Sequence, residues 1–183
     1  MPPPTTSSPP STSIFYRVLG TSLGPSFDAH IRELYGVAPT ECTPEPTSVA
    51  SFPDCEYRTF YRTTRASDNE STTKIVYCFD RITSDTLLLA AVHLSGSIAL
   101  DDQLLSLPAG LQLSWTGRQI VGTLGEPKRK GGASSTATAA AMSLTSGVWL
   151  AWDTLGIQVE LVATNWESHN ASIREIILYQ PTK

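Results

Sequence analysis

A glycine-rich stretch near the N-terminus has the spacing of a serine nucleophile. Gly20-Thr-Ser22-Leu-Gly24 matches the pattern G-x-S-x-G and lies between an expected strand and an expected helix. In serine hydrolases that use this pattern, the turn exposes the serine above a sheet, and an acid and a histidine follow in the chain. The residues available for those roles are Asp80 or Asp153 as the acid and His93 or His169 as the base. Only one expected strand precedes Ser22 and no crossover helices are expected after it, so a glycine-rich connector entering a helix is the favoured interpretation.

The histidines and cysteines do not have the spacing of a metal site. A zinc site needs four ligands, commonly with C-x-x-C spacing. The three histidines and three cysteines are instead scattered along the chain: His30, His93, His169, Cys42, Cys55 and Cys78. His93 falls in an apolar strand, where a hydrogen-bonded core imidazole is the favoured interpretation. Phosphate-binding glycine motifs do not occur, so the sequence predicts no metal, no cofactor and no catalytic residue set.

One basic cluster and two tryptophans remain as candidates for binding. Lys128-Arg129-Lys130 follows Pro127 and resembles a short nuclear-import signal, which needs exposed clustered charge; a solvated loop is the alternative. Trp149 and Trp152 lie three residues apart, so on a strand they point to opposite faces. One of them then faces away from the core, where it is available to anchor a partner protein.

Composition limits the classes of protein to which this chain can belong. It has 183 residues, of which 40% are hydrophobic and 16% charged, as expected for one folded domain. The net charge of −4 argues against direct nucleic-acid binding, and the longest apolar runs are too short to span a bilayer. The odd number of cysteines and the lack of a secretory signal indicate an intracellular protein. Residues 1–13 hold five prolines with serine and threonine, which predicts a disordered tail before a domain at 14–183.

The elements expected to position these residues are mostly strands. Phe27, Ile31 and Leu34 have helical spacing before Gly36, which predicts a helix over 26–35. Four prolines make 38–54 irregular, and the basic turn and small residues of 125–147 indicate a flexible loop. The expected strands are 14–19, 56–64, 74–79, 87–94, 148–152, 158–163 and 173–179, with weaker candidates at 111–115 and 119–124. The predicted fold class is mainly β or α+β: an antiparallel sheet that curls or closes into a barrel, with one N-terminal helix packed on it.

The last expected strand is apolar on both faces. Ile176 and Leu178 point opposite to Ile177 and Tyr179, so each face needs cover. One cover is the core, and the other is a helix of this chain or a partner protein. Ile176, Ile177 and Leu178 therefore join Trp149 and Trp152 as candidate interface residues.

The order of these segments resembles the TBP-related subunit 20 family of the Mediator head module. The similar pieces are IFYRVL with FDAHIRELYG, then DCEYRTFYRTT, then TTKIVYCFDRITSDTLLLAAVHLSG, and later SWTGRQIVG and WDTLGIQVELVATNWESHNASIREIILYQ. Together they cover about two thirds of residues 14–180. The resemblance implies a non-enzymatic, nuclear coactivator subunit that pairs with Mediator subunit 18, docks with it on a helix of subunit 8 and regulates transcription by RNA polymerase II.

Two other functions stay open. A β-barrel of about eight strands can hold a small ligand or perform acid–base chemistry at its mouth, with His93 and Tyr77 as the first candidates. The third possibility is the serine hydrolase that uses the GTSLG turn. A packed interior with an apolar outer patch favours the interaction subunit over both.

Overall fold

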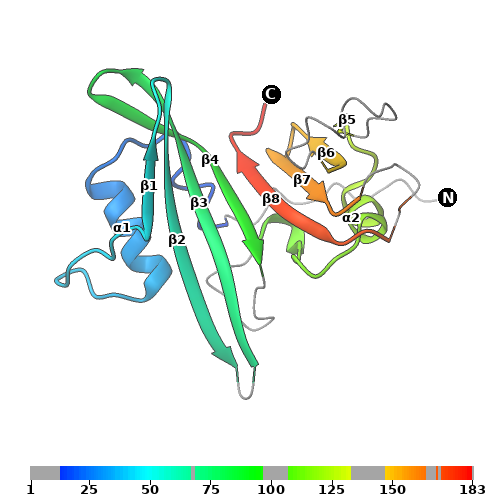
Figure 1. The fold of residues 1–183 in the computed structure, drawn as a ribbon, viewed down its shortest axis with the longest axis horizontal. Helices are drawn as coiled ribbons and strands as arrows, with labels where there is room; N and C mark the ends of the chain where they lie inside the picture. Colours follow the sequence, from blue (N-terminus) through cyan, green and yellow to red (C-terminus); the bar gives the residue numbers. More distant parts are fainter. Residues whose placement is uncertain are drawn as a thin grey trace, which may run out of the picture.

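The fold is taken from a computed structural model that describes residues 13–66, 69–96, 107–132, 147–163, 168 and 170–182. Figure 1 shows β1–β4 with α1 beside them on one side, and β5–β8 with α2 on the other. The predicted tail and the centre of the predicted loop, residues 1–12 and 133–146, lie outside the described residues. The elements are α1 (Pro25–Tyr35), β1 (Ser48–Ser51), β2 (Cys55–Ala66), β3 (Asn69–Thr83), β4 (Thr86–Gly96), η2 (Pro108–Gly110), α2 (Gly117–Leu124), β5 (Arg129–Gly131), β6 (Trp149–Trp152), β7 (Ile157–Leu161) and β8 (Ile173–Tyr179).

All the described strands belong to one antiparallel sheet. Its order is β1-β2-β3-β4-β8-β7-β6-β5, with β1 and β5 at the two edges, so the sheet does not close into a barrel. The predicted fold class, a mainly β, curled antiparallel sheet with an N-terminal helix, is confirmed. The last strand of the chain, β8, lies in the middle and pairs with both β4 and β7. The β2–β3 hairpin extends well beyond the rest of the sheet (Figure 1).

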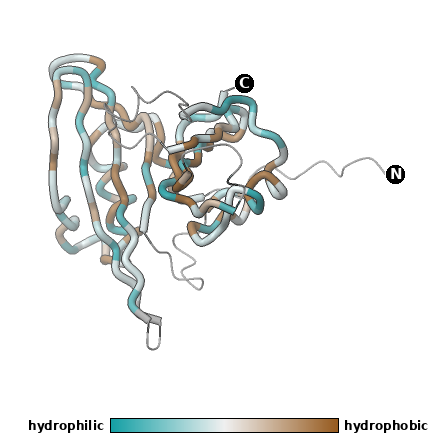
Figure 2. Tube along the Cα trace, turned by 45° about the vertical axis from the view of Figure 1, so that its right-hand side comes forward, coloured by the Kyte–Doolittle hydropathy of each residue, from teal (hydrophilic) through white to brown (hydrophobic). Residues whose placement is uncertain are grey.

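The register of the strands defines an inner face that carries the core. Successive cross-strand partners on this face are Phe60, Ile75, Leu94, Ile176, Val159 and Leu150, and all six are buried. A parallel row contains Tyr77, Val92, Leu178, Ile157 and Trp152. Figure 2 shows the hydropathic consequence: the tube is brown where strands cross the core and paler along the projecting end of the β2–β3 hairpin.

Helix α1 covers one half of the inner face. Pro25 begins the helix, and Gly36 ends it with a left-handed φ of 65°. The predicted apolar stripe is correct, since Phe27, Ile31 and Leu34 are all buried. The Phe27 ring lies edge-on to Tyr77, with ring centres 5.1 Å apart. Aromatic packing of this kind fixes the helix on the sheet.

Helix α2 covers the other half, at a place where the sequence predicts a weak strand over 119–124, and that strand prediction is wrong. Gln119 explains the difference, because its Oε1 accepts a hydrogen bond of 2.8 Å from the Thr116 backbone N–H and caps the helix start. Trp152 Nε1 donates to the Gly125 carbonyl at 3.0 Å and ties β6 to the end of the helix. Ile120 of α2 is fully buried in the core.

Two further strand predictions were wrong. Residues 14–19 form successive turns, with hydrogen bonds from Tyr16 N–H to the Ser13 carbonyl and from Val18 N–H to the Phe15 carbonyl. Their buried residues are spaced in adjacent pairs, Ile14 with Phe15 and Val18 with Leu19, which suits turns and not an alternating strand. Residues 111–115 also form turns.

Two short strands lie where irregular structure was expected. β1 fits between Pro46 and Pro53 and pairs with β2 as an exposed edge strand. β5 lies at the start of the predicted loop and pairs with β6. No helix within the described residues is long and apolar enough to cross a membrane.

Candidate functional site

The sheet has a second face, which we call the outer face. In the described part of the chain, both helices pack on the inner face and neither covers this one. Three rows of cross-strand neighbours make up its middle. They are Trp149, Glu160 and Glu175; Ala151, Gln158, Ile177, His93 and Val76; and Tyr179, Ala91, Cys78 and Tyr57. All except the buried Ala151 are partly exposed.

The five candidate interface residues divide between the two faces. Trp152, Ile176 and Leu178 are core residues of the inner face, with 4%, 0% and 0% of their surface exposed. Trp149 and Ile177 are half-buried on the outer face. The interface prediction therefore rests on Trp149 and Ile177, since the other three are covered by this chain itself.

Trp149 lies flat against the edge of the sheet. A side chain at Gly131, its cross-strand neighbour, would overlap the indole ring, so the ring occupies the space that the glycine leaves. The Arg129 guanidinium stacks over the same ring, 5.8 Å from its centre. These contacts hold the indole in one orientation while part of it stays exposed.

An acidic pair lies beside Trp149. Glu160 is the cross-strand partner of Trp149 and also of Glu175, so the two carboxylates face each other directly. Burial and the neighbouring Glu175 raise the pKa of Glu160. On the next row, His93 Nδ1 lies 3.2 Å from Glu175 Oε2. Arg174 and His93 act in the opposite direction and lower the pKa of Glu160. A further cationic group placed over the pair would stabilise its charged form.

The predicted import signal does not present its three side chains together. Arg129 donates to both carboxylate oxygens of Asp153, at 2.7 and 2.6 Å, and Tyr179 OH donates to Asp153 Oδ1 at 2.7 Å. These hydrogen bonds lower the pKa of Asp153 to about 2. Lys130, the next residue of β5, points to the inner face, where it lines a cavity beside α2. Lys128 is exposed, and nuclear import stays a prediction.

The groups nominated for a serine hydrolase are not brought together among the described residues. Ser22 is exposed and forms an isolated bridge with Leu88. Its hydroxyl makes no hydrogen bond to a histidine or carboxylate in the part of the chain that is described. Asp153 is held by Arg129, and His93 by Glu175. His169 lies outside the described residues.

The two groups nominated for a ligand-binding barrel lie on opposite faces. Tyr77 is fully buried on the inner face, and its hydroxyl shares a hydrogen bond of 2.7 Å with His30 Nε2. His93 belongs to the outer face. His30 was missed in the sequence, although it lies three residues after Phe27 on the apolar side of α1, which is the signal for a buried residue. Burial lowers the pKa of His30 to about 4.

The cysteines do not form a metal site in the described structure. Cys55 and Cys78 flank Tyr57, and hydrogen bonding with Cys78 is the main cause that raises the pKa of Tyr57 to about 12. Cys42 is exposed in a separate segment. Among the described residues, no group of three or more histidine, cysteine or acidic side chains is arranged to hold a metal ion.

Comparison with known proteins gives no match to a family model, a curated protein or a solved structure. Function must therefore be inferred from the contacts of this chain and from the sequence resemblance described above.

Proposed function

We propose that this chain is a non-enzymatic interaction subunit of a multiprotein assembly, and that the assembly is the head module of Mediator. The observation that carries the proposal is the outer face, whose middle holds Ile177, Val76 and Tyr179 among its polar residues, where a solvated sheet face would be mostly polar. Antiparallel sheets that face water on one side normally alternate apolar and polar residues. β8 instead has Ile177 and Tyr179 on the outer face as well as Ile176 and Leu178 on the inner one.

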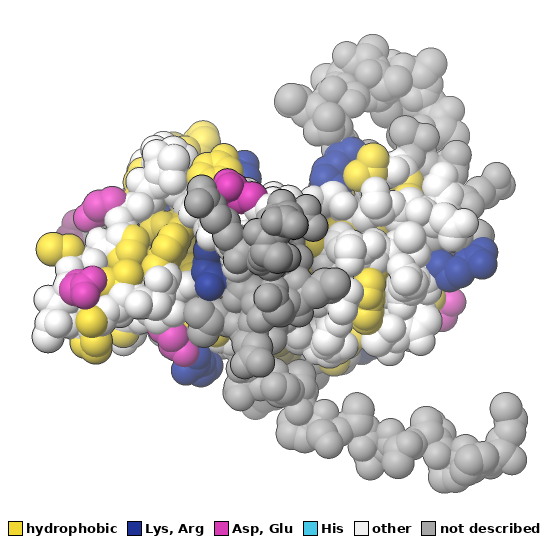
Figure 3. All heavy atoms as spheres, turned by 90° about the horizontal axis from the view of Figure 1, so that it is seen from below, with side chains coloured by type: hydrophobic (Ala, Val, Ile, Leu, Met, Phe, Trp, Pro, Cys, Tyr) yellow, Lys and Arg dark blue, Asp and Glu magenta, His cyan; other side chains and the backbone are white. Residues whose placement is uncertain are grey.

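Exposed hydrophobic side chains outside this face are more widely separated. Figure 3 shows hydrophobic side chains reaching the surface in separate groups, with single charged side chains between them. Of the most exposed large ones, Ile82 and Val162 lie on different elements, whereas Phe52 packs against Tyr57 of the outer face. On the outer face, by comparison, Ile177, Val76, Ala91 and Tyr179 lie on the neighbouring strands β3, β4 and β8. Tyr179 pairs with Ala91, and His93 pairs with both Ile177 and Val76, so the four apolar side chains surround His93. Contiguous apolar patches commonly mark protein interfaces.

The fold also gives structural roles to the side chains that the serine hydrolase and the ligand-binding or acid–base barrel would use. His30 is paired with Tyr77 in the core, His93 with Glu175, and Asp153 with Arg129. Each side chain satisfies a partner within the fold. This arrangement supports an interaction role over the two catalytic alternatives.

The proposed partner contributes apolar side chains over Ile177 and a cationic side chain over Glu160 and Glu175. By the resemblance to the subunit 20 family, this partner is Mediator subunit 18, and the pair docks on a helix of subunit 8. The proposed location is the nucleus, where these subunits act with RNA polymerase II. Direct contact with nucleic acid is not part of the proposal, because the chain is acidic overall.

The proposal is tested by co-purification of the full tagged chain, expressed at its native level. We expect subunits 18 and 8 to be recovered with the wild-type chain and lost with Ile177→Lys. The matched control is Ile82→Lys, the same substitution at a β3 side chain that is 59% exposed. Thermal unfolding of both variants checks that the fold is retained.

A second variant guards against unfolding of Ile177→Lys. The substitution Glu160→Gln relieves the repulsion with Glu175, keeps the contact between Glu175 and His93, and should not lower the stability of the fold. It should weaken recovery of subunit 18 and reduce the dependence of binding on salt. The proposal is wrong if these subunits are absent with the wild-type chain, or if both variants recover them at wild-type levels.

A further inference from the structure

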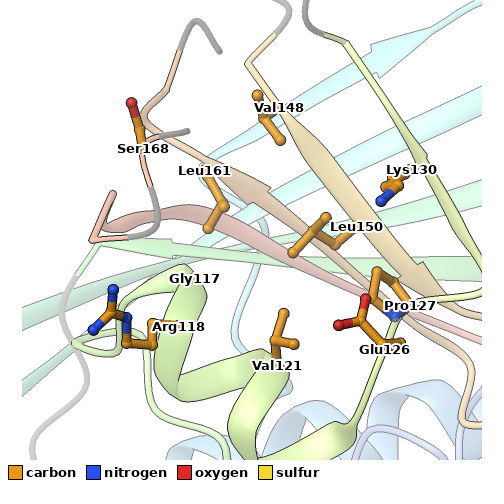
Figure 4. Close-up of a pocket in the computed structure, with 10 residues that line it drawn as sticks. All are labelled: Gly117, Arg118, Val121, Glu126, Pro127, Lys130, Val148, Leu150, Leu161 and Ser168. Carbon is orange, nitrogen blue, oxygen red and sulfur yellow. The ribbon is translucent and has the colours of Figure 1, made fainter. Parts of the chain in front are cut away.

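A cavity separates α2 from the end of the sheet formed by β5, β6 and β7 (Figure 4). Its volume is about 540 Å³, within the range of roughly 300–1,000 Å³ that is typical of small-molecule sites. The cavity lies on the inner face, so it is separate from the outer face that carries the proposed interaction. It is also unrelated to the His30–Tyr77 pair beneath α1.

The walls of the cavity are apolar and come from both layers. Val121 projects from α2, and Leu150 and Leu161 project from β6 and β7, with Val148 beside them (Figure 4). The three sheet-side residues are 2–6% exposed, so they belong to the core rather than to an open surface. Gly117, at the start of α2, also lines the cavity. The space is therefore built into the packing of α2 on the sheet.

Charged side chains lie at two ends of these walls. Arg118 is near the start of α2 at one end, and Lys130 and Glu126 are on the side of the cavity away from Arg118 (Figure 4). With two cationic side chains and one acidic one, the lining has an excess of one positive charge, whereas the whole chain has a net charge of −4. Arg118 also lies in the first turn of α2, where the helix dipole favours a negative group.

We propose that this cavity binds a small organic anion that has an apolar body and one carboxylate or sulfonate group. The apolar body packs between Val121 on one side and Leu150 and Leu161 on the other. The anionic group lies at the Arg118 end, where the guanidinium donates charge-assisted hydrogen bonds to it. This binding site is independent of the proposed interaction with Mediator subunits, because it uses the opposite face of the sheet.

The test uses two fluorescent probes that share an anilinonaphthalene body and differ in charge. 8-Anilinonaphthalene-1-sulfonate is anionic, and N-phenyl-1-naphthylamine is neutral. We expect the full-length chain to bind the anionic probe with one-to-one stoichiometry and more tightly than the neutral probe. Decanoate should displace the anionic probe from the wild-type chain.

Three variants locate the binding. Arg118→Gln should weaken the anionic probe about tenfold and leave the neutral probe unchanged, as expected for loss of a charge-assisted hydrogen bond. Lys128→Gln is the matched control, since this exposed lysine is outside the lining. Val121→Trp should fill the cavity and abolish binding of both probes, with unfolding curves to confirm that the variant is folded.

Two results would overturn the proposal. One is unchanged affinity for the anionic probe in Val121→Trp, which would place the probe elsewhere, for example on the outer face. The other is equal weakening by Arg118→Gln and Lys128→Gln, which would show attraction to general surface charge. Neither result affects the co-purification test, so the two proposals fail separately.

Discussion

The buried pair of His30 and Tyr77 should make the fold sensitive to mild acid. His30 is 6% exposed on α1, and its ring lies between Phe15 and Phe27, with ring centres 5.9 and 6.3 Å away. Burial is the main cause that lowers its pKa from 6.5 to about 4. Among nearby charges, Glu33 acts to raise this pKa and Arg17 to lower it.

The sign follows from comparing proton binding in the two states. The folded pKa is below the unfolded one, so between pH 6.5 and about 4 the unfolded chain binds more protons at His30 than the folded chain does. The free energy of unfolding therefore decreases as the pH falls through this window. Each pKa unit is equivalent to about 1.4 kcal/mol, so lowering the pH from about 7 to about 4.5 should remove roughly 2 kcal/mol through His30 alone.

Urea unfolding, followed by tryptophan fluorescence at these two pH values, measures the effect. Other groups also titrate in this range, so the wild-type chain is compared with the double variant His30→Leu, Tyr77→Phe, which removes both ends of the hydrogen bond. Exchanging both partners for apolar side chains of similar shape leaves no unsatisfied buried group. We expect the double variant to lose about 2 kcal/mol less stability between the two pH values than the wild-type chain. Equal losses in the two proteins would refute the assignment of a low pKa to His30.

Three further predictions concern the sheet. Leu178→Ala should lower the free energy of unfolding by about 2–5 kcal/mol in urea titrations, and Ile177→Ala should lower it clearly less, because Leu178 is 0% exposed and Ile177 is half-buried. Equal decreases would contradict the assignment of the two faces. The pKa of Asp153, measured by NMR, should be about 2, and Arg129→Gln should raise it towards its ordinary value by removing two hydrogen bonds. An unchanged pKa in the variant would show that the ion pair does not form in solution. Gly156→Ala should lower the melting temperature, because φ is 65° and the added Cβ would collide with a backbone carbonyl oxygen of β8; an unchanged melting temperature would refute this turn geometry.

The sequence predicted the elements whose local pattern agrees with their place in the fold. The helix at α1 follows from Phe27, Ile31 and Leu34, because one apolar stripe meets one sheet face. The two hairpins that join β2, β3 and β4 follow from three strand-forming segments, one alternating and the others more apolar, with short polar turns between them. The strand at β8 was predicted too, and the prediction that its two faces are both apolar agrees with Ile176 and Leu178 on the inner face and Ile177 and Tyr179 on the outer one.

The elements that were missed are those decided by a few specific contacts. α2 is only eight residues long, and its IVGTL segment suits either state until the Gln119 cap and the Trp152 hydrogen bond favour the helix. The segment 14–19 looked like a strand because it is apolar, but its buried residues occur in adjacent pairs. The cavity beside α2 followed from no sequence signal, because it depends on where α2 lies relative to β6 and β7.

The sequence predicted which candidate interface residues lie on opposite faces, but not which of the two faces is exposed. Sequence spacing correctly placed Trp149 and Trp152 on opposite faces, and likewise Ile177 and its neighbours, but it did not say which face was the core. Tertiary packing decides this, because both helices lie on the side of Trp152 and Leu178. The import-signal prediction treats Lys128, Arg129 and Lys130 as one exposed cluster. In β5, however, Arg129 lies on the outer face and Lys130 on the inner face, because successive strand residues alternate.

The position of β8 links stability to the proposed interaction. β8 joins β4 to β7, so one strand connects the α1 half of the sheet to the α2 half. Its inner residues Ile176 and Leu178 belong to the core, while Ile177 between them belongs to the outer face. A partner that covers the outer face would therefore contact the strand that connects the two halves. Because it would bind only the folded chain, it would stabilise the fold by mass action. Partner binding and domain stability should accordingly be measured on the same variants. Inner-face substitutions should lower both, whereas the outer-face substitution at Ile177 should lower mainly partner binding.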